Sequence, residues 1–398
     1  MCNFDRPLPA CAGLNKRRHN LPINPREQAM TGTGASRYTQ ETTIPSRPTG
    51  PRHICVAGAS GLAGAHITRA ALALGWRVTG TLRDATDSSK TIHLMALPGA
   101  KERLRLVSAN TADPESFAPA LDGADTLVIA CLPSIRKAPD GTAAGDLDRE
   151  TGLEHCVIPA QSACHNLIEA AHLSGISDIV LLSSTASAEP ENAPRIKNEL
   201  RHHSDFELQI QQRKFIAAQK TAMEVAAARL AQDRALRLII LLSGMIVGPG
   251  VLPCHDQGHI LVRLREMAVG AHPWHHQTPK GSMSLIHPSD LAALCLAALQ
   301  KPGSEGRYFA VARSWQWTEI YSEIAKFVPV GALPTAVPKG TDPVPPTQFD
   351  FTRRDSLAVP RHGLAAMIAS FFHWLDRHDH PDFGKVTAGA HPTGATNR

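Results

Sequence analysis

A cluster of three glycines carries the clearest chemical signal in the sequence. Gly58, Gly61 and Gly64 follow the apolar run 54–56 and lead directly into an alanine-rich segment with helical spacing. A strand, a tight turn and a helix in this order present free backbone N–H groups that bind a phosphate. The spacing is G-x-x-G-x-x-G, so the dinucleotide fingerprint G-x-G-x-x-G is not matched literally. We predict a phosphate-binding turn, with a purely structural turn as the alternative.

The segments that would position this turn alternate between strand and helix patterns. Their apolar runs are nearly continuous, as in a parallel sheet covered on both faces. Strands are predicted over 77–82, 104–109, 125–131, 178–183 and 236–242, and helices over 114–121, 153–173 and 215–230. Strands separated by helices predict right-handed crossovers and an α/β fold with a doubly wound parallel (Rossmann) sheet.

The rest of the chain has less regular patterns. Beyond residue 248, loops rich in Gly and Pro alternate with predicted helices near 260–267, 289–299 and 363–374. We predict a nucleotide-binding Rossmann domain over 52–245 and a smaller, discontinuous, mainly substrate-binding region over 246–377. Residues 1–51 and 378–398 have the composition of disordered tails. For the first tail, a transit peptide and a start at Met30 are alternatives.

Composition narrows the class of protein. The chain has 398 residues, of which 43% are hydrophobic and 19% charged, and its formal net charge is +5. No run of Lys and Arg is interleaved with aromatic residues, so we predict no nucleic-acid partner. The eight cysteines lack C-x-x-C spacing, which favours a reducing, cytoplasmic location. No apolar stretch reaches about 18 residues, so no membrane span is expected.

Several separate stretches resemble the extended short-chain dehydrogenase/reductases of the NAD-dependent epimerase/dehydratase superfamily. They are VAGASGLAGAHITRAALALGWRVTGTLRD, KTIHLMALPGAKERLRLVSA, LLSSTAS, KTAMEVAA, MIVGPG and LIHPSDLA. The likeness is to the dihydroflavonol 4-reductase and cinnamoyl-CoA reductase branch, in collinear order from about residue 53 to 377. The ALPGAKERL segment is the most specific, because no general chemistry would make unrelated folds converge on it.

The resemblance implies NADP(H) as the cofactor. Arg83 follows the second predicted strand, where an acidic residue would instead bind a ribose 2′-hydroxyl and repel a phosphate. A guanidinium suits a phosphate, although Arg83 could also pair with Asp84 or Asp87 on the surface. The positions that match cofactor contacts in this family are Gly58, Ser60, Gly61, Leu62 and Gly64 in the phosphate loop, Arg83 and Lys90 for the 2′-phosphate, Asn110 for the adenine, Ala130 of the segment 130–133 for the nicotinamide ribose, Lys220, and Ser243 and Gly244 in place of a Pro-Gly pair.

The resemblance implies a catalytic Ser, Tyr and Lys, of which this chain matches two. Ser184 matches the serine that hydrogen-bonds the substrate oxygen, and Lys220 matches the lysine that holds the ribose and lowers the pKa of the tyrosine hydroxyl. The tyrosine is absent. Ile216 stands four residues before Lys220, on the same helical face, and its neighbour Phe215 has no hydroxyl. The tyrosines present, Tyr38, Tyr308 and Tyr321, do not match the family pattern.

Histidine clusters in the sequence could bind a metal or transfer a proton. Two groups have residue types that bind metals, but neither has helical i, i+4 spacing or an evident distant partner, so we predict no metal site. These groups are His202, His203 and Asp205, and His272, His275 and His276. An imidazole from these loops could replace the missing acid, because its pKa near ~6.5 suits proton transfer. His287 and Asp290 match a family His-x-x-Asp position, for which we predict a structural role before a late helix.

The resemblance implies NADPH-dependent reduction of a ketone or aldehyde, or the reverse oxidation, on a medium-sized secondary metabolite. Such a small molecule is the expected partner. A catalytically silent NADP(H)-binding sensor or scaffold is the alternative from another class, and an epimerase or dehydratase of the same superfamily is a further one. The oligomeric state stays open, although the helices near residues 153 and 215 resemble family elements that pair in homodimers.

Overall fold

Seven parallel strands form the central sheet, in the order β10-β7-β5-β4-β1-β2-β3. The computed structural model describes residues 52–132, 134–192, 194–336 and 344–377. Both predicted tails, Tyr38 and Pro133 therefore lie outside the described residues. The strands are β1 His53–Ala57, β2 Arg77–Leu82, β3 Leu104–Ser108, β4 Thr126–Ile129, β5 Asp178–Ser184, β7 Arg237–Ser243 and β10 Gly306–Ala310. The predicted doubly wound Rossmann fold is confirmed.

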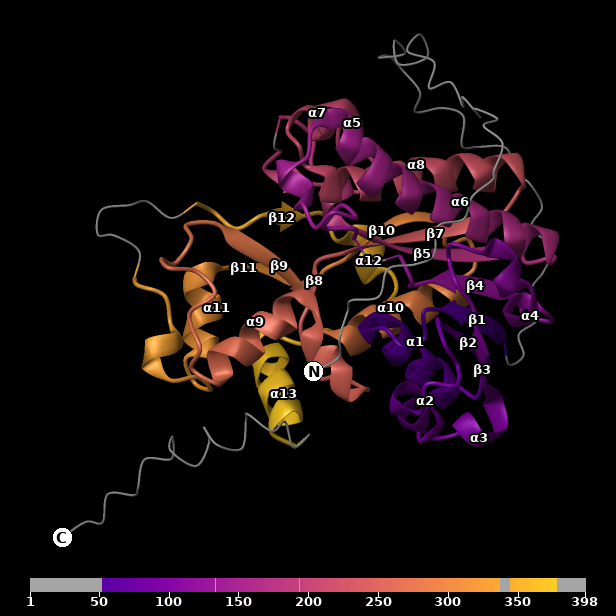
Figure 1. Ribbon diagram of the computed structural model, residues 1–398, viewed down its shortest axis with the longest axis horizontal. Helices are drawn as coiled ribbons and strands as arrows, with labels where there is room; N and C mark the ends of the chain where they lie inside the picture. Colours follow the sequence, from indigo (N-terminus) through magenta and orange to yellow (C-terminus); the bar gives the residue numbers. More distant parts are fainter. Residues whose placement is uncertain (1–51, 133, 193, 337–343, 378–398) are drawn as a thin grey trace. The chain divides into compact units, whose positions relative to one another are not determined.

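Helices cover both faces of this sheet, as Figure 1 shows. Helices α1 (Leu62–Ala73) and α10 (Pro288–Gln300) pack together on one face, and α6 (Ile158–Leu173) and α8 (Phe215–Asp233) on the other. Successive strand residues enter opposite cores: Ile54 and Val56 lie in the α1 and α10 core, whereas Cys55 lies in the α6 and α8 core. Burial on both faces explains why these strands read as continuous apolar runs.

Shorter helices complete this part of the chain. They are α2 Ser88–Met95, α3 Ala100–Arg103, α4 Ala118–Leu121, α5 Arg149–Gly152 and α7 Phe206–Gln211. The prediction of one regular helix over 153–173 is corrected, because Leu153–Val157 forms a wider π-helical turn between α5 and α6. Pro159 lies in the first turn of α6 and has no N–H, so it cannot donate a hydrogen bond to the preceding turn of helix. The regular i to i−4 hydrogen bonds of α6 therefore begin at this point.

The later chain contributes to the central sheet and also builds a smaller unit. Strand β10 lies beyond residue 245 and pairs with β7, so the sheet is not confined to residues 52–245. A second sheet has the order β11-β9-β8, and β12 pairs with β6. The bounds are β6 Ile196–Lys197, β8 Met245–Ile246, β9 Ser282–Ile286, β11 Arg313–Gln316, β12 Gln348–Phe349, α9 His259–Ala268, α11 Trp317–Ile324, α12 Thr352–Asp355 and α13 Leu364–Arg377. Among the helices described, none is both long and apolar enough to cross a membrane.

Candidate functional site

The turn between β1 and α1 is held in a shape that needs glycine. Gly58 has a φ of +90°, and a Cβ on it would lie 2.8 Å from Cα of Cys131. A Cβ on Gly64 would lie 2.1 Å from the carbonyl oxygen of Gly58, so α1 packs directly on the turn. The N–H of Gly58 donates to Oγ1 of Thr81 at 3.0 Å, and the N–H of Ala59 donates to the Thr81 carbonyl at 2.9 Å. The turn is thus fixed to β2 before any ligand binds.

The first turn of α1 has the features of an anion site. Gly61 is the N-cap, and α1 has no side-chain cap and no acidic residue in its first turn, which begins at Leu62. Its N–H groups are therefore available to a phosphate. His255 fixes the preceding carbonyl: Nδ1 accepts from the N–H of Val251 at 3.1 Å, so Nε2 carries the proton and donates to the Ser60 carbonyl at 3.0 Å. This cradle fits the diphosphate of a dinucleotide.

The two predicted 2′-phosphate contacts differ in their surroundings. Arg83 follows β2, is exposed, and has no hydrogen-bond or ion-pair partner among the described residues. Asp84 accepts instead from Thr86, at 2.8 Å from its N–H, and Asp87 pairs with Lys90 at 2.6 Å. Arg83 therefore pairs with neither Asp84 nor Asp87 and remains available to a phosphate, whereas Lys90 already has a carboxylate partner.

Two further predicted cofactor contacts lie near strand ends. Asn110 follows β3 and is exposed, and its Oδ1 accepts from the N–H of Ala112 at 3.1 Å, which leaves the amide NH₂ for a ligand. Ala130 follows β4, and its N–H donates to the Ala57 carbonyl at 3.0 Å. Because all these strands are parallel, their carboxyl ends lie at the same edge as the phosphate loop, where open α/β sheets bind ligands.

Ser184 and Ser243 end neighbouring strands of that edge. They are paired in register at the last residues of β5 and β7. Oγ of Ser184 accepts from the N–H of Ala186 at 3.2 Å, so its hydroxyl proton is free to donate to a substrate oxygen. Oγ of Ser243 donates to the Ser183 carbonyl at 3.0 Å. A Cβ on Gly244 would lie 2.4 Å from the Ser284 carbonyl oxygen, so the second sheet packs closely against this strand end.

Lys220 points from α8 to the loop that follows β4. Its Nζ donates to the Leu132 carbonyl at 2.8 Å, and its side chain is buried. Burial lowers the pKa of Lys220 to about 8, because desolvation outweighs the opposing charge of Glu224. Lys220 is thus an ammonium group held beside the segment predicted to lie over the nicotinamide ribose, and its charge is sensitive to pH near neutrality.

A buried ion pair that the sequence does not reveal lies next to the strand end that bears Ser184. Glu224 accepts hydrogen bonds from the hydroxyls of Ser183 and Ser187, and Nε of Arg307 lies 3.0 Å from its Oε2. Nη2 of Arg307 also donates to the Ser187 carbonyl at 2.9 Å. These contacts fix the residues on both sides of Ser184. The i, i+4 spacing from Lys220 could have indicated Glu224, but Arg307 comes from distant β10.

Neither of the tyrosines in the described part of the chain, Tyr308 and Tyr321, takes the place of the missing catalytic tyrosine. Ile216 lies in the first turn of α8, partly buried against an apolar cluster that contains Phe215. Tyr308 is buried within β10, two residues before the strand ends, and the guanidinium of Arg353 lies over its ring. The hydroxyl of Tyr321 is hydrogen-bonded to Nδ1 of His275 at 2.5 Å.

The loop that carries His202 and His203 has a structural role in this fold. Nδ1 of His203 accepts from Arg307 at 2.9 Å, and burial together with this guanidinium lowers the pKa of His203, which disfavours the protonated ring that a general acid needs. Nδ1 of His202 accepts from the N–H of Asn198 at 2.8 Å, and Asp205 caps α7. The expectation of a proton donor from His202 or His203 is therefore not supported by these contacts.

One cluster of possible metal ligands occurs among the described residues, formed by His287, Asp290 and His362. The rings of His287 and His362 are stacked at 4.0 Å with an angle of 22°, so their nitrogen lone pairs do not converge. Both oxygens of Asp290 accept from His362, one from its N–H and one from Nδ1, each at 2.7 Å. His287 is the N-cap of α10. The predicted structural role of His287 and Asp290 is confirmed.

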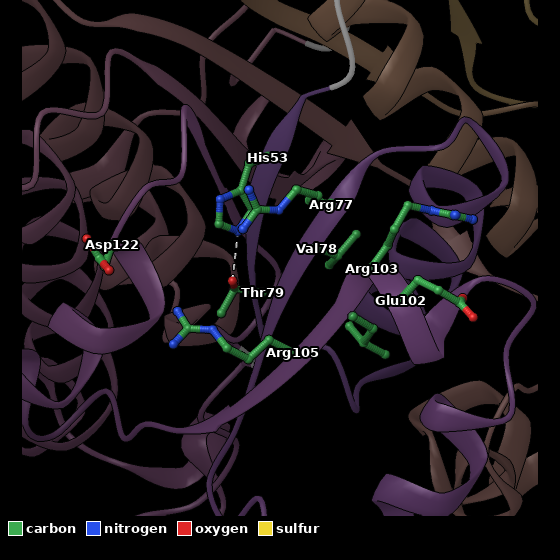
Figure 2. A pocket seen from close by; sticks show the side chains of 9 residues that line it. His53, Arg77, Val78, Thr79, Glu102, Arg103, Arg105 and Asp122 are labelled. Carbon is green, nitrogen blue, oxygen red and sulfur yellow. Dashed lines mark hydrogen bonds between the residues drawn. The ribbon is translucent and has the colours of Figure 1, made fainter.

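A surface pocket of about 210 Å³ lies at the opposite edge of the sheet (Figure 2). It is lined by the first residues of three strands, His53, Arg77 and Leu104, and by Arg105 and Asp122. His53 is already hydrogen-bonded, through Nε2 to Thr79 at 2.9 Å. Because ligands of such sheets bind at the carboxyl ends of the strands, this pocket is not the candidate site.

Comparisons with known proteins agree with this geometry. The NAD dependent epimerase/dehydratase family matches residues 54–312. Tetraketide alpha-pyrone reductase 1 of Arabidopsis thaliana is 26% identical over 303 residues, which cover 75% of this chain and 86% of that protein. Cinnamoyl-CoA reductase CAD2 of Medicago truncatula is 24% identical over 310 residues, 77% of this chain and 90% of the relative.

Solved structures show the same fold. The structure of yeast methylglyoxal/isovaleraldehyde reductase Gre2 complexed with NADPH has a TM-score of 0.66 and 17% identity, and covers 84% of this chain and 99% of that chain. The matched segment holds the phosphate turn, Ser184 and Lys220, and the resemblance to extended short-chain dehydrogenase/reductases is confirmed. The chain belongs to the NAD dependent epimerase/dehydratase family, whose nicotinamide cofactor fits the cradle at the carboxyl edge of the sheet.

Proposed function

We propose that this protein is an NADPH-dependent oxidoreductase that reduces a ketone or aldehyde of a medium-sized secondary metabolite, or oxidises the corresponding alcohol. The observation that carries the proposal is the position of the desolvated Lys220 ammonium, 2.8 Å from the Leu132 carbonyl, at the edge that also bears Ser184 and the phosphate turn. The names of the relatives support it, because each of them is a reductase and one solved structure contains NADPH.

Separate residues would bind the cofactor and assist the reduction. The phosphate turn and the α1 N-terminus would hold the diphosphate, and Arg83 the 2′-phosphate. The bound nicotinamide supplies the hydride. Ser184 donates a hydrogen bond to the substrate oxygen, and the positive charge of Lys220 stabilises the negative charge that develops there. Because Ile216 stands at the position of the tyrosine, water supplies the proton that this oxygen takes.

The same Ile216 favours a second candidate, a catalytically silent NADP(H)-binding sensor or scaffold. Loss of NADPH absorbance with a panel of ketones, aldehydes and flavanonol-like compounds separates the two. Turnover well above that of a Lys220→Ala variant supports the reductase. NADPH binding measured by fluorescence without turnover of any compound supports the sensor, and absence of NADPH binding contradicts both.

Arg83→Ala is expected to weaken NADPH binding by about 10- to 100-fold, because it removes charge-assisted hydrogen bonds to a phosphate. NADH, which lacks the 2′-phosphate, is expected to bind the variant and the parent protein equally. Fluorescence titration with both cofactors measures the effect, and Lys101→Ala, which removes an exposed cation from α3, is the control. Unchanged NADPH affinity in the Arg83 variant would rule out NADP selection by this residue.

The reduction rate is expected to fall as pH rises through about 8, because Lys220 then loses its charge. In Lys220→Arg, which stays charged, this limb of the pH profile is expected to disappear. The lowered pKa of Lys220 also makes the free energy of unfolding depend on pH. Between about 8 and 10.5 the unfolded chain binds more protons than the folded one, so the contribution of Lys220 to the free energy of unfolding rises with pH in that window. A pH profile without a limb near 8 would contradict the role of Lys220.

A further inference from the structure

The loop after β4 is clamped to the face of α8 that bears Lys220. The Leu132 carbonyl accepts from Nζ of Lys220 at 2.8 Å. Three residues later, Gln219 holds the backbone of Ile135 at both groups: Oε1 accepts from its N–H at 2.8 Å, and Nε2 donates to its carbonyl at 2.7 Å. Adjacent residues of one helix thus fix two points of the loop, and Arg136 follows directly on the second.

Arg136 is fixed on its other side as well. Its carbonyl accepts from the N–H of Ala144 at 2.8 Å, and Lys137 and Ala143 form a β-bridge. The backbone that carries the Arg136 guanidinium is therefore held at successive residues beside the catalytic helix. A charged group on such a rigid support loses little conformational freedom when a ligand binds.

The Arg136 side chain has no partner of its own within the described part of the chain. Among the residues that the structure describes, none forms a hydrogen bond or ion pair with its guanidinium. The side chain is exposed, yet surrounding protein atoms lower the pKa of Arg136 by desolvation, and no carboxylate opposes this. A desolvated cation without a counter-charge is a prepared anion site.

The charges around Lys220 also favour the binding of an anion. Arg136 is close enough to lower the pKa of Lys220 by like-charge repulsion. Glu224 is the carboxylate that faces Lys220, but its Oε2 is 3.0 Å from Nε of Arg307, so that charge is already balanced. The catalytic edge therefore carries uncompensated positive charge.

We propose that Arg136 binds a carboxylate of the substrate, so that the carbonyl compound this enzyme reduces is an oxo acid. A guanidinium binds a carboxylate through two parallel hydrogen bonds, which would orient the reacting carbonyl towards Ser184. The inference rests on the proposed reductase function and adds the chemical class of its substrate.

The test compares matched acids and esters. Benzoylformate and benzoylacetate are assayed against their methyl and ethyl esters, respectively, with the parent protein, Arg136→Gln, Arg136→Lys and the control Lys137→Gln. The parent protein is expected to prefer the acids, and Arg136→Gln to lower kcat/KM for the acids by about 10- to 100-fold with little change for the esters. Arg136→Lys is expected to recover part of the loss, and Lys137→Gln to behave as the parent.

Binding provides a readout that does not need turnover. Calorimetric titration of the NADP⁺-loaded protein with benzoylformate is expected to show binding that Arg136→Gln weakens and Lys137→Gln does not. An acid-to-ester ratio or an acid affinity that is unchanged in Arg136→Gln would overturn the proposal, as would an equal loss of NADPH affinity, which would make Arg136 a cofactor contact. If neither acids nor esters are reduced but benzoylformate binding depends on Arg136, the reductase function fails and the carboxylate site stands.

Discussion

Replacing Glu224 by glutamine is expected to lower the free energy of unfolding by about 3 to 5 kcal/mol, because it leaves the buried guanidinium of Arg307 without its charge partner. The side chains of Glu224 and Arg307 are each 8% exposed, and the atoms that pair are 3.0 Å apart. Burial raises the pKa of Glu224 and lowers that of Arg307, while the pairing and the hydroxyls of Ser183 and Ser187 oppose these shifts. Urea unfolding of parent and variant measures the difference.

Another glutamate and arginine pair provides a matched control. Glu169 and Arg234 lie 2.9 Å apart but are 28% and 42% exposed, so Glu169→Gln is expected to cost only about 0 to 1 kcal/mol. The double variant Glu224→Gln/Arg307→Gln, which removes both charges, is expected to lose less stability than the sum of the two single changes. Equal effects of Glu224→Gln and Glu169→Gln would show that the buried pair does not stabilise the catalytic strand end.

The central sheet could be predicted because its signals are local. Continuous apolar runs and the glycine turn identify the strands and the phosphate loop without any knowledge of distant contacts. Helix α8 was predicted over 215–230 and extends over Phe215–Asp233, since its buried alanines recur at helical spacing at 218, 222, 227 and 231. The π-helical turn before α6 was missed, because a proline in an otherwise helical pattern marks a disturbance but not its form.

The surroundings of the candidate catalytic residues could not be predicted in the same way. Ser184 and Lys220 were found through family resemblance, but the Glu224 and Arg307 pair joins α8 to β10, and its two residues are 83 positions apart in the sequence. The isolated cation Arg136 was missed for a related reason. A sequence shows that an arginine is present, whereas its lack of a partner is a property of the folded loop.

Replacing Ile216 by tyrosine is expected to raise the rate of carbonyl reduction by about 10²- to 10⁴-fold, which is the usual contribution of a positioned general acid. Ile216 lies one helical turn before Lys220, so a hydroxyl introduced there shares the helix face of the ammonium. Lys220 is already desolvated, and its positive charge would lower the pKa of a nearby phenol. Ile216 is only partly buried against its apolar cluster, so a larger ring there need not be forced wholly into the core.

Ile216→Phe separates the hydroxyl from the ring. It adds nearly the same volume at the same position, so it is expected to leave the rate near that of the parent or to lower it. Because the gain requires the ammonium, the double variant Ile216→Tyr/Lys220→Ala is expected to lose most of it. A fall in rate with both Ile216→Tyr and Ile216→Phe, while NADPH binding persists, would instead mean that Ile216 lines a substrate pocket, and that the parent enzyme takes its proton from water.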